Sequence, residues 1–385
     1  MARPLKLQRE LRSVTVALSV FHLGKALAGV FIPLVILQSG GALWQVAGFY
    51  VVYAIIKLVL NYPIIRIIQR YGAHVGLGIG FFSSALQIAA ILGYSETQHA
   101  LWLIAGATGL AIANAFVWSS QHLHISRVMN QSTKSSSLAT MTIINQTIDI
   151  IAPLVGGLIG ALLGAQWLLT AALLAIIASI WPLRKMGQLG RLSGTEKATY
   201  NLRGAPKRDI VANFFFNVET SIGVMLWPIY LAVVVKSFSE IGIIAAITGV
   251  ATMVTVWLAG RRGDRGEDRA VLKEGVAINS LIDLARIFAT TTATITFVSA
   301  AYKASLAYFG NAWTSTYYSH AKRKGIPYIM SMEIGCDLAY ASLWSLLLAV
   351  LLVSGSEEFF LVAFLIAAAS AWGCLLISRQ GKFER

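Results

Sequence analysis

Windows of about 20 mostly apolar residues recur along the whole sequence, and this recurrence restricts the fold more than any other feature. A helix needs about 20 such residues to cross the hydrocarbon core of a bilayer. Hydrophobic residues make up 57% of the 385 residues and charged residues only 12%, a balance that soluble domains do not show. The sequence therefore predicts an all-α integral membrane protein.

Twelve such windows are present, and we expect one transmembrane helix in each. They lie at residues 12–38, 44–68, 74–94, 99–126, 136–163, 166–183, 209–235, 240–260, 270–291, 295–320, 327–353 and 358–378. A basic, polar connection separates the sixth window from the seventh. It predicts an amino-terminal six-helix bundle at 1–183, a cytoplasmic linker at 184–208 and a carboxy-terminal six-helix bundle at 209–385.

The distribution of charge predicts the orientation of the chain. Most of the 31 Lys and Arg residues lie at the two ends and in the even-numbered connections, whereas the odd-numbered connections hold almost none. Cytoplasmic loops carry such an excess of basic residues, so both termini are expected in the cytoplasm. The short loops favour a plasma membrane, and a bacterial inner membrane in particular. The net charge of +14 is scattered among loops instead of covering one face, which argues against nucleic acid as a partner.

The sequence lacks the parts of several other function classes. It contains no nucleotide-binding loop or nucleophile constellation, so we expect neither an enzyme nor an ATP-driven pump, and no cofactor. Both cysteines, Cys336 and Cys374, fall in apolar windows and are expected to pack as small hydrophobic residues, without a metal site. The predicted partners are the lipid bilayer, a small-molecule substrate and protons or another coupling ion, for a chain that acts as a monomer.

The two predicted bundles carry matching landmarks. One common shift along the sequence places Pro33 on Pro228, Trp118 on Trp313 and Gln69-Arg70 on Asp264-Arg265. Six helices per half leave both halves in the same orientation, so the repeat is parallel, about an axis along the membrane normal. Such repeats place a substrate site near the middle of the membrane, between the halves.

Two motifs resemble those of the major facilitator superfamily, and the resemblance covers nearly the whole chain. The family's loop signature Gly-x-x-x-Asp-Arg-x-Gly is similar to Gly260-Arg-Arg-Gly-Asp264-Arg265, and its earlier copy is reduced to Gln69-Arg70-Tyr71-Gly72. The fifth window reads Asp149-Ile-Ile-Ala-Pro153-Leu-Val-Gly156-Gly157, which is similar to the Gly-Pro-x-x-Gly-Gly element of drug/proton antiporters. The resemblance implies the two-bundle fold of this family and transport by alternating access.

The resemblance also implies that the two loop motifs are gates. In this arrangement Asp264 faces the start of the fifth helix, at Ser135-Ser136-Ser137, where the positive end of the helix dipole stabilises a carboxylate. The alternative is that the charge run from Arg261 to Asp268 only fixes the topology. Two departures bear on coupling: Gln69 replaces the acid of the first motif, and the fourth window lacks the buried Arg of many proton-coupled relatives.

Ionisable side chains inside the windows are the main candidates for coupling, because a charge at bilayer depth costs at least ~2.5 kcal/mol. Poor solvation at that depth favours the protonated form of a carboxylate, as a proton carrier needs. The four candidates are Asp149, Glu219, Glu333 and Asp337. A static salt bridge to Lys25, Lys57 or Lys303 is the alternative role for each. Asp283 and Arg286 have the spacing of an intrahelical ion pair, which we interpret as structural.

Other side chains in these windows are candidates for lining a substrate cavity. They are His22, Lys25, Lys57, Asn114, Trp118, Gln121, Asn145, Gln146, Asn217, Trp227, Lys303, Asn311 and Trp313. Each polar residue alone is equally explained as a hydrogen-bonding link between helices. Helix kinks that would let gates bend are predicted at Pro33, Pro153, Gly156, Gly157 and Pro228.

The leading functional interpretation is a secondary active transporter that exports small organic compounds in exchange for protons. The near balance of acids and lysines in the windows favours cationic, zwitterionic or amphiphilic substrates. Three alternatives stay open: a nutrient-uptake symporter or uniporter, a non-transporting receptor on a transporter fold, and a protein that moves lipids.

Overall fold

The computed structural model describes residues 2–128, 135–184, 203–263 and 268–378. Side chains are described in the same ranges except at 2–12, 122–128, 135–142, 259–263, 268 and 326. Helices and short connections account for all of this part of the chain, which contains no strand. The predicted all-α fold is therefore confirmed.

Two compact units make up the chain. The amino-terminal unit comprises Met1–Glu196 and Ser237–Gly242, and the carboxy-terminal unit comprises Lys197–Lys236 and Ile243–Arg385. The helices before residue 197 are α1 (Ala2–Ala28), η1 (Gly29–Phe31), α2 (Ile32–Gln38), α3 (Leu43–Tyr71), α4 (Ala73–Thr97), α5 (Ala100–Val128), α6 (Ser135–Leu162), α7 (Ala165–Ala178) and α8 (Ile180–Leu183).

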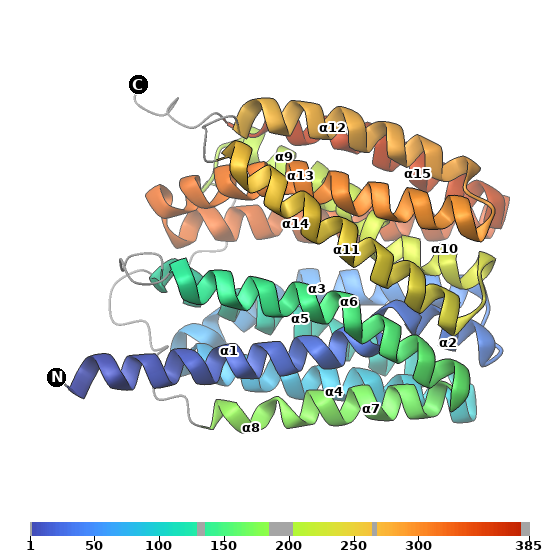
Figure 1. Ribbon diagram of the computed structural model, residues 1–385, viewed down its shortest axis with the longest axis horizontal. Helices are drawn as coiled ribbons and strands as arrows, with labels where there is room; N and C mark the ends of the chain where they lie inside the picture. Colours follow the sequence, from blue (N-terminus) through green and yellow to red (C-terminus); the bar gives the residue numbers. More distant parts are fainter. Residues whose placement is uncertain (1, 129–134, 185–202, 264–267, 379–385) are drawn as a thin grey trace. The chain divides into compact units, whose positions relative to one another are not determined.

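The later helices follow in the same order in Figure 1. They are α9 (Lys207–Ser221), η2 (Ile222–Leu226), α10 (Trp227–Val234), α11 (Phe238–Gly263), α12 (Asp268–Ala285), η3 (Arg286–Phe288), α13 (Thr292–Lys324), α14 (Ile326–Ser354), α15 (Ser356–Gly373) and η4 (Cys374–Leu376).

Ten helical segments in the described ranges are long and apolar enough to cross a membrane. The two predicted spans outside this group are α12 and α13, which form helices but are more polar. Glu274, Asp283 and Arg286 fall in the first of these two spans, and Lys303 lies in the second. The chain is thus a multi-pass membrane protein, and its two most polar spans both lie in the carboxy-terminal unit.

Small residues bring the helices of the amino-terminal unit close together. α4 packs on α5 and α7, and α1 packs on α6 and α7. A side chain at Gly109 of α5 would lie 2.8 Å from the carbonyl oxygen of Ser83 in α4, and one at Gly80 would lie 2.7 Å from Val117. Close contact through small residues is the usual packing of membrane helices, and it fixes α5 as a support for the polar residues described below.

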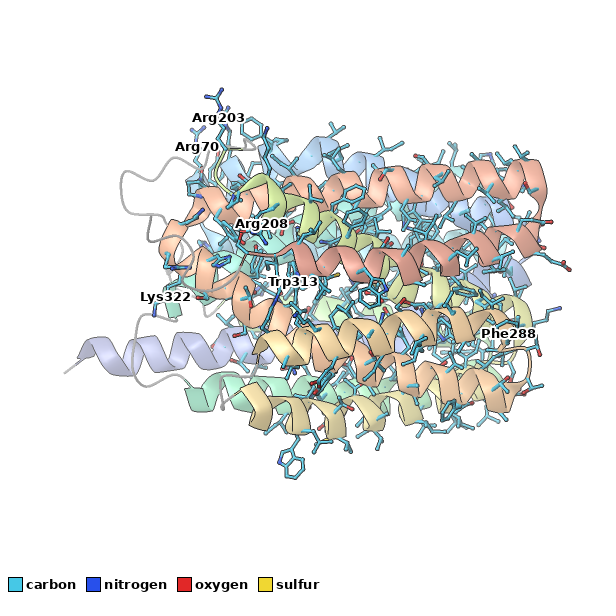
Figure 2. All side chains as sticks on the ribbon, turned by 90° about the horizontal axis from the view of Figure 1, so that it is seen from above. Arg70, Arg203, Arg208, Phe288, Trp313 and Lys322 are labelled. Carbon is cyan, nitrogen blue, oxygen red and sulfur yellow. The ribbon has the colours of Figure 1, made fainter. Side chains whose placement is uncertain are left out.

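In the carboxy-terminal unit, α12 packs between α13 and α15, and α9 packs on α14 and α15. Figure 1 shows α12 running beside α15. Basic side chains gather at one end of this unit: Arg203, Arg208 and Lys322 lie at the end opposite to Phe288 (Figure 2). The orientation predicted from the sequence places this basic end in the cytoplasm.

The first span of each half is interrupted just before a proline. In the first, the 3-10 turn η1 precedes Pro33, which lies in the first turn of α2. In the seventh, the π-helical turn η2 precedes Pro228, in the first turn of α10. A proline lacks the N–H that would continue the helical ladder, so such interruptions accompany it. Pro153, by contrast, lies inside the continuous helix α6.

Candidate functional site

An ion pair between α1 and α6 is the most accessible polar contact among the predicted coupling residues. His22 Nε2 lies 2.8 Å from Asp149 Oδ1, and the two side chains are 35% and 52% exposed. Both residues sit inside apolar helices that are long enough to cross a membrane. The packing of the helices therefore leaves both side chains partly uncovered.

A second polar group lies on the same side of α1, one turn further along. Lys25 Nζ donates a hydrogen bond to Asn114 Oδ1 of α5 at 3.1 Å, and Asn114 Nδ2 donates to the Tyr53 hydroxyl of α3 at 3.1 Å. Together with His22 and Asp149, these three residues form what we call the amino-terminal cluster. It draws one polar side chain or more from each of four helices, α1, α3, α5 and α6.

The other predicted cavity residues of this unit differ in burial. Lys57 on α3 is buried, Gln121, Asn145 and Gln146 are half-buried, and Trp118 on α5 is 52% exposed. The predicted kink residue Gly156 packs its backbone on the carbonyl oxygen of Leu27 in α1. A side chain there would separate α1 from α6, so Gly156 maintains the spacing across which His22 and Asp149 meet.

The first loop motif forms the turn between α3 and α4. Gly72 has a φ of 98°, a conformation that glycine adopts without strain, and its N–H donates to the Ile68 carbonyl oxygen at 2.8 Å. Arg70 stacks over the ring of Tyr71, and Gln69 precedes it at the end of α3. The second motif begins at Gly260 in α11, but Asp264 and Arg265 lie outside the described residues. The predicted latch therefore stays a prediction.

The carboxy-terminal unit contains a fully buried charge network between α9 and α12. Arg286 Nη1 donates to Asp283 Oδ1 at 2.9 Å, and both side chains are inaccessible to solvent. The predicted ion pair of these two residues is confirmed. Asn279 Nδ2 donates to Asp283 Oδ2 at 3.1 Å and to Glu219 Oε1 at 2.8 Å. These four residues form the Arg286 network, in which one amide links two carboxylates.

Aromatic rings enclose the cation of this network. The Arg286 guanidinium lies 3.5 Å from the centre of the Tyr302 ring and 4.6 Å from that of Trp227. Trp227 in turn donates from Nε1 to the Ser299 hydroxyl at 2.8 Å. Rings on two sides stabilise a desolvated cation through its attraction to their π faces. Glu219 and Trp227 are thereby placed in a packed interior.

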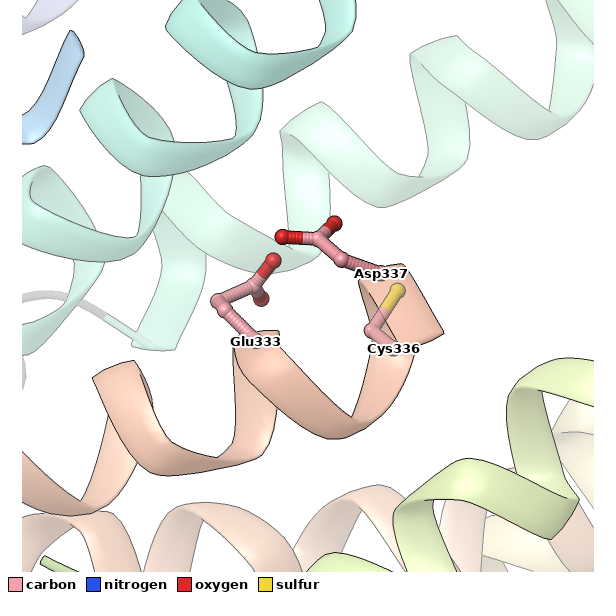
Figure 3. A group of neighbouring side chains, drawn as sticks. All are labelled: Glu333, Cys336 and Asp337. Carbon is pink, nitrogen blue, oxygen red and sulfur yellow. The ribbon is translucent and has the colours of Figure 1, made fainter. Parts of the chain in front are cut away.

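The remaining two predicted carboxylates meet on α14. The ligand atoms of Glu333, Cys336 and Asp337 all lie within 4.8 Å of one another, and Figure 3 shows the three side chains leaving the same side of the helix. Asp337 is buried and Glu333 half-buried. The Cys336 Sγ donates to Asn217 Oδ1 of α9 at 3.1 Å. These four residues form the α14 cluster.

Aromatic residues lie next to this cluster. The ring of Trp313 stacks on that of Phe216, with the centroids 4.1 Å apart and the planes at 3°. The ring centroid of Tyr317 lies 5.6 Å from that of Trp313. Trp313 is buried and Figure 2 shows it between the two ends of the unit. Lys303 is half-buried and Asn311 exposed on the same helix, α13. Phe216, which the sequence analysis did not single out, thus lies against the predicted cavity residue Trp313.

Several residues at these sites were not expected from the sequence. Tyr53 and Asn279 link polar side chains on neighbouring helices, and Cys336 was expected only to fill space. A signal for Cys336 did exist, since Glu333-x-x-Cys336-Asp337 places three ligand-bearing side chains on one helix face. Cys374 is buried with its Sγ directed at the Ser370 carbonyl oxygen, as expected for packing.

No family model and no curated protein matches this sequence. Solved structures do resemble the fold. The nucleoside transporter NupG has a TM-score of 0.71 at 13% identity, over 96% of this chain and 100% of that one. A bacterial homologue of the iron transporter ferroportin, in an inward-facing state, has a TM-score of 0.70 at 15% identity, over 96% and 98%.

A third similar structure comes from the major facilitator superfamily by its own description. This transporter, FucP in its outward conformation, has a TM-score of 0.63 at 14% identity, over 95% of this chain and 97% of that one. All three similarities extend over nearly the full length of both chains, as expected if this chain has the predicted two-bundle architecture. The chain therefore has the fold of the major facilitator superfamily.

Proposed function

We propose that this protein is a secondary active transporter that works by alternating access and exports small cationic, zwitterionic or amphiphilic compounds in exchange for protons. The fold supports transport in general, because the similar structures include a nucleoside transporter and a bacterial homologue of an iron transporter. That diversity means that the substrate class has to be argued from the side chains of this chain.

The His22–Asp149 pair carries the proposal. It joins α1 to α6 at 2.8 Å, and its two side chains are 35% and 52% exposed. An imidazole and a carboxylate in contact hold either one or two protons, so the net charge of the pair changes by one unit when a proton is taken up. Such a change alters the attraction between α1 and α6, which is how proton binding can bias a two-state carrier.

The neighbouring cation of the amino-terminal cluster bears on the substrate. Lys25 is held by the neutral Asn114 at 3.1 Å, and it lies 5.9 Å from the ring centre of Phe21. When protonated, Lys25 would attract the carboxylate of a zwitterionic substrate, while Asp149 offers the opposite charge on α6. A compound with one charge of each sign fits this pairing better than an anion.

The test is proton movement in liposomes that hold the purified protein and a pH-sensitive dye. Cationic and zwitterionic compounds are added, and the rate of dye response is compared for the wild type, Asp149→Asn and His22→Asn. We expect the compound-evoked proton flux to fall by about 100-fold in both variants, the size expected when a positioned proton-transfer group is removed. An imposed pH gradient then decides whether protons move against the substrate or with it.

Thr147→Val is the matched control, because Thr147 is exposed on α6 and its hydroxyl donates to the Ile143 carbonyl oxygen of the same helix. It should keep the wild-type flux. Substrate uptake that persists in the wild type without any proton flux would refute the coupling and leave a uniporter. Proton flux that is unchanged in Asp149→Asn would remove this pair from the mechanism.

A further inference from the structure

The α14 cluster combines three kinds of ligand atom at the spacing of a coordination shell. Glu333 and Asp337 supply carboxylate oxygens, Cys336 supplies a sulfur, and one atom from each lies within 4.8 Å of the other two. Opposite ligands of a metal ion are about 4 Å apart and adjacent ones somewhat less. The three ligand atoms are therefore close to the spacing of ligands on one ion.

A fourth ligand comes from a different helix. Asn217 of α9 places its Oδ1 3.1 Å from the Cys336 Sγ. In a tetrahedral site with ordinary metal–sulfur and metal–oxygen distances, neighbouring ligand atoms are about 3.5 Å apart. The Asn217 oxygen is therefore already at ligand spacing from the sulfur, and the set of donors spans two helices instead of one acidic turn.

The orientation of Asn217 is fixed independently of the cluster. Its Nδ2 donates to the Asn213 carbonyl oxygen at 2.8 Å and to Asn213 Oδ1 at 3.1 Å. Asn213 is itself anchored to α14, because its Nδ2 donates to the Met332 carbonyl oxygen at 2.6 Å. Because the Asn217 amide nitrogen donates to Asn213, the Asn217 Oδ1 points to Cys336. Hydrogen bonds that orient a ligand in this way are a regular part of metal sites.

The surroundings favour a ligand at this point. Phe216 precedes Asn217 and stacks on Trp313, whose side chain is only 4% exposed. A packed aromatic wall on one side lowers the local dielectric and strengthens the attraction of the carboxylates for a cation.

We propose that Asn217, Glu333, Cys336 and Asp337 bind one divalent transition-metal ion. A thiolate selects against Mg²⁺ and Ca²⁺, which prefer oxygen alone, whereas two carboxylates and an amide suit Zn²⁺, Co²⁺ or Fe²⁺ better than a soft monovalent ion. On binding, Cys336 releases its proton to solvent and coordinates as the thiolate. The site lies wholly within the carboxy-terminal unit and does not depend on the proposed proton coupling at His22 and Asp149.

Titration of the purified full-length protein with Co²⁺ tests the site, because a cobalt–thiolate bond gives a charge-transfer absorption that oxygen ligands do not give. We expect a band that saturates at one Co²⁺ per protein and disappears when Zn²⁺ is added. It should be absent in Cys336→Ser and kept in Cys374→Ser, which removes the only other thiol. Glu333→Gln and Asp337→Asn should each raise the Co²⁺ dissociation constant by at least about 10-fold.

Two results would overturn the proposal: no thiolate band in the wild-type protein, or a band that survives in Cys336→Ser. Melting temperatures of the variants, measured without metal, confirm that each has folded, and Asp337→Asn provides a second ligand variant that leaves the thiol intact. Asp149→Asn should bind Co²⁺ like the wild type. A loss of proton flux with an intact metal band, or the reverse, therefore separates this site from the proposed coupling pair.

Discussion

The amino-terminal cluster and the Arg286 network both place polar or charged side chains inside membrane helices, but only the first contains a pair whose side chains are exposed. His22 and Asp149 are 35% and 52% exposed, whereas Asp283 and Arg286 are fully buried. An accessible pair can exchange protons with water during a transport cycle. A buried pair is held by its surroundings, and its removal leaves a charge without compensation. From this difference we expect proton exchange at the exposed pair and a role in stability for the buried network.

The largest effect is expected from Arg286→Met, which leaves Asp283 and Glu219 in the interior without their cation. Breaking a buried pair from one side typically costs about 3 to 5 kcal/mol, so we expect a strongly lowered melting temperature of the detergent-solubilised protein. The double variant Arg286→Met/Asp283→Asn should recover part of the loss, because it removes one of the two acids left without their cation. A single variant that melts like the wild type would contradict the structural role.

The next largest difference is expected between alanine substitutions of the two tryptophans that correspond in the sequence repeat. Trp313 is 4% exposed and stacks on Phe216, whereas Trp118 is 52% exposed. Trp313→Ala should cost about 3 kcal/mol through the cavity it leaves, and Trp118→Ala less than about 1 kcal/mol. Thermal unfolding of the two variants side by side measures this. Equal losses would mean that both halves pack this position in the same way.

A smaller difference in stability is expected between substitutions of the glycines in the two helix interruptions. A side chain at Gly223, in the π-helical turn, would collide with the Tyr302 hydroxyl, whereas nothing lies within 4 Å of one at Gly29 in η1. Gly223→Ala should therefore destabilise the protein by about 1 to 3 kcal/mol. Gly29→Ala should be neutral or stabilise it by up to about 1 kcal/mol, since alanine restricts the unfolded chain. Melting temperatures that fall equally would remove the distinction.

The smallest change in stability is expected at the accessible pair itself. His22→Gln removes one partner of an ion pair that solvent already screens, so the free energy of unfolding should change by less than about 1 kcal/mol. A loss of proton flux in liposomes without a change in melting temperature would support the assignment of this pair to function. A variant that unfolds readily would place His22 with the structural residues instead.

The positions of the helices could be predicted from the sequence because hydropathy and length decide them locally. Predicted window 209–235, for example, corresponds to the helices from Lys207 to Val234. The Asp283–Arg286 pair was predictable for the same reason, since both residues lie on one turn of α12 and η3.

Contacts between helices could not be predicted in the same way. The links from His22 to Asp149 and from Asn279 to Glu219 depend on which faces of distant segments meet, and periodicity alone does not specify this. The α14 cluster is an intermediate case. Its three donors on one helix follow from their spacing, but the fourth, Asn217, required the packing of α9 on α14.

The π-helical turn at Ile222–Leu226 sets the rotational phase of the seventh span. In an uninterrupted α-helix, Glu219 and Trp227 would lie roughly 80° apart around the axis. A π turn takes up about one extra residue, and leaving that residue out of the count brings the two side chains back to within ~20° of each other. This is why Glu219 can reach Asn279 while Trp227 covers Arg286. The seventh span thus contains one residue more than an α-helix would need to place Glu219 and Trp227 on the same side. The π-helical turn accommodates this extra residue at the point where Gly223 packs against Tyr302.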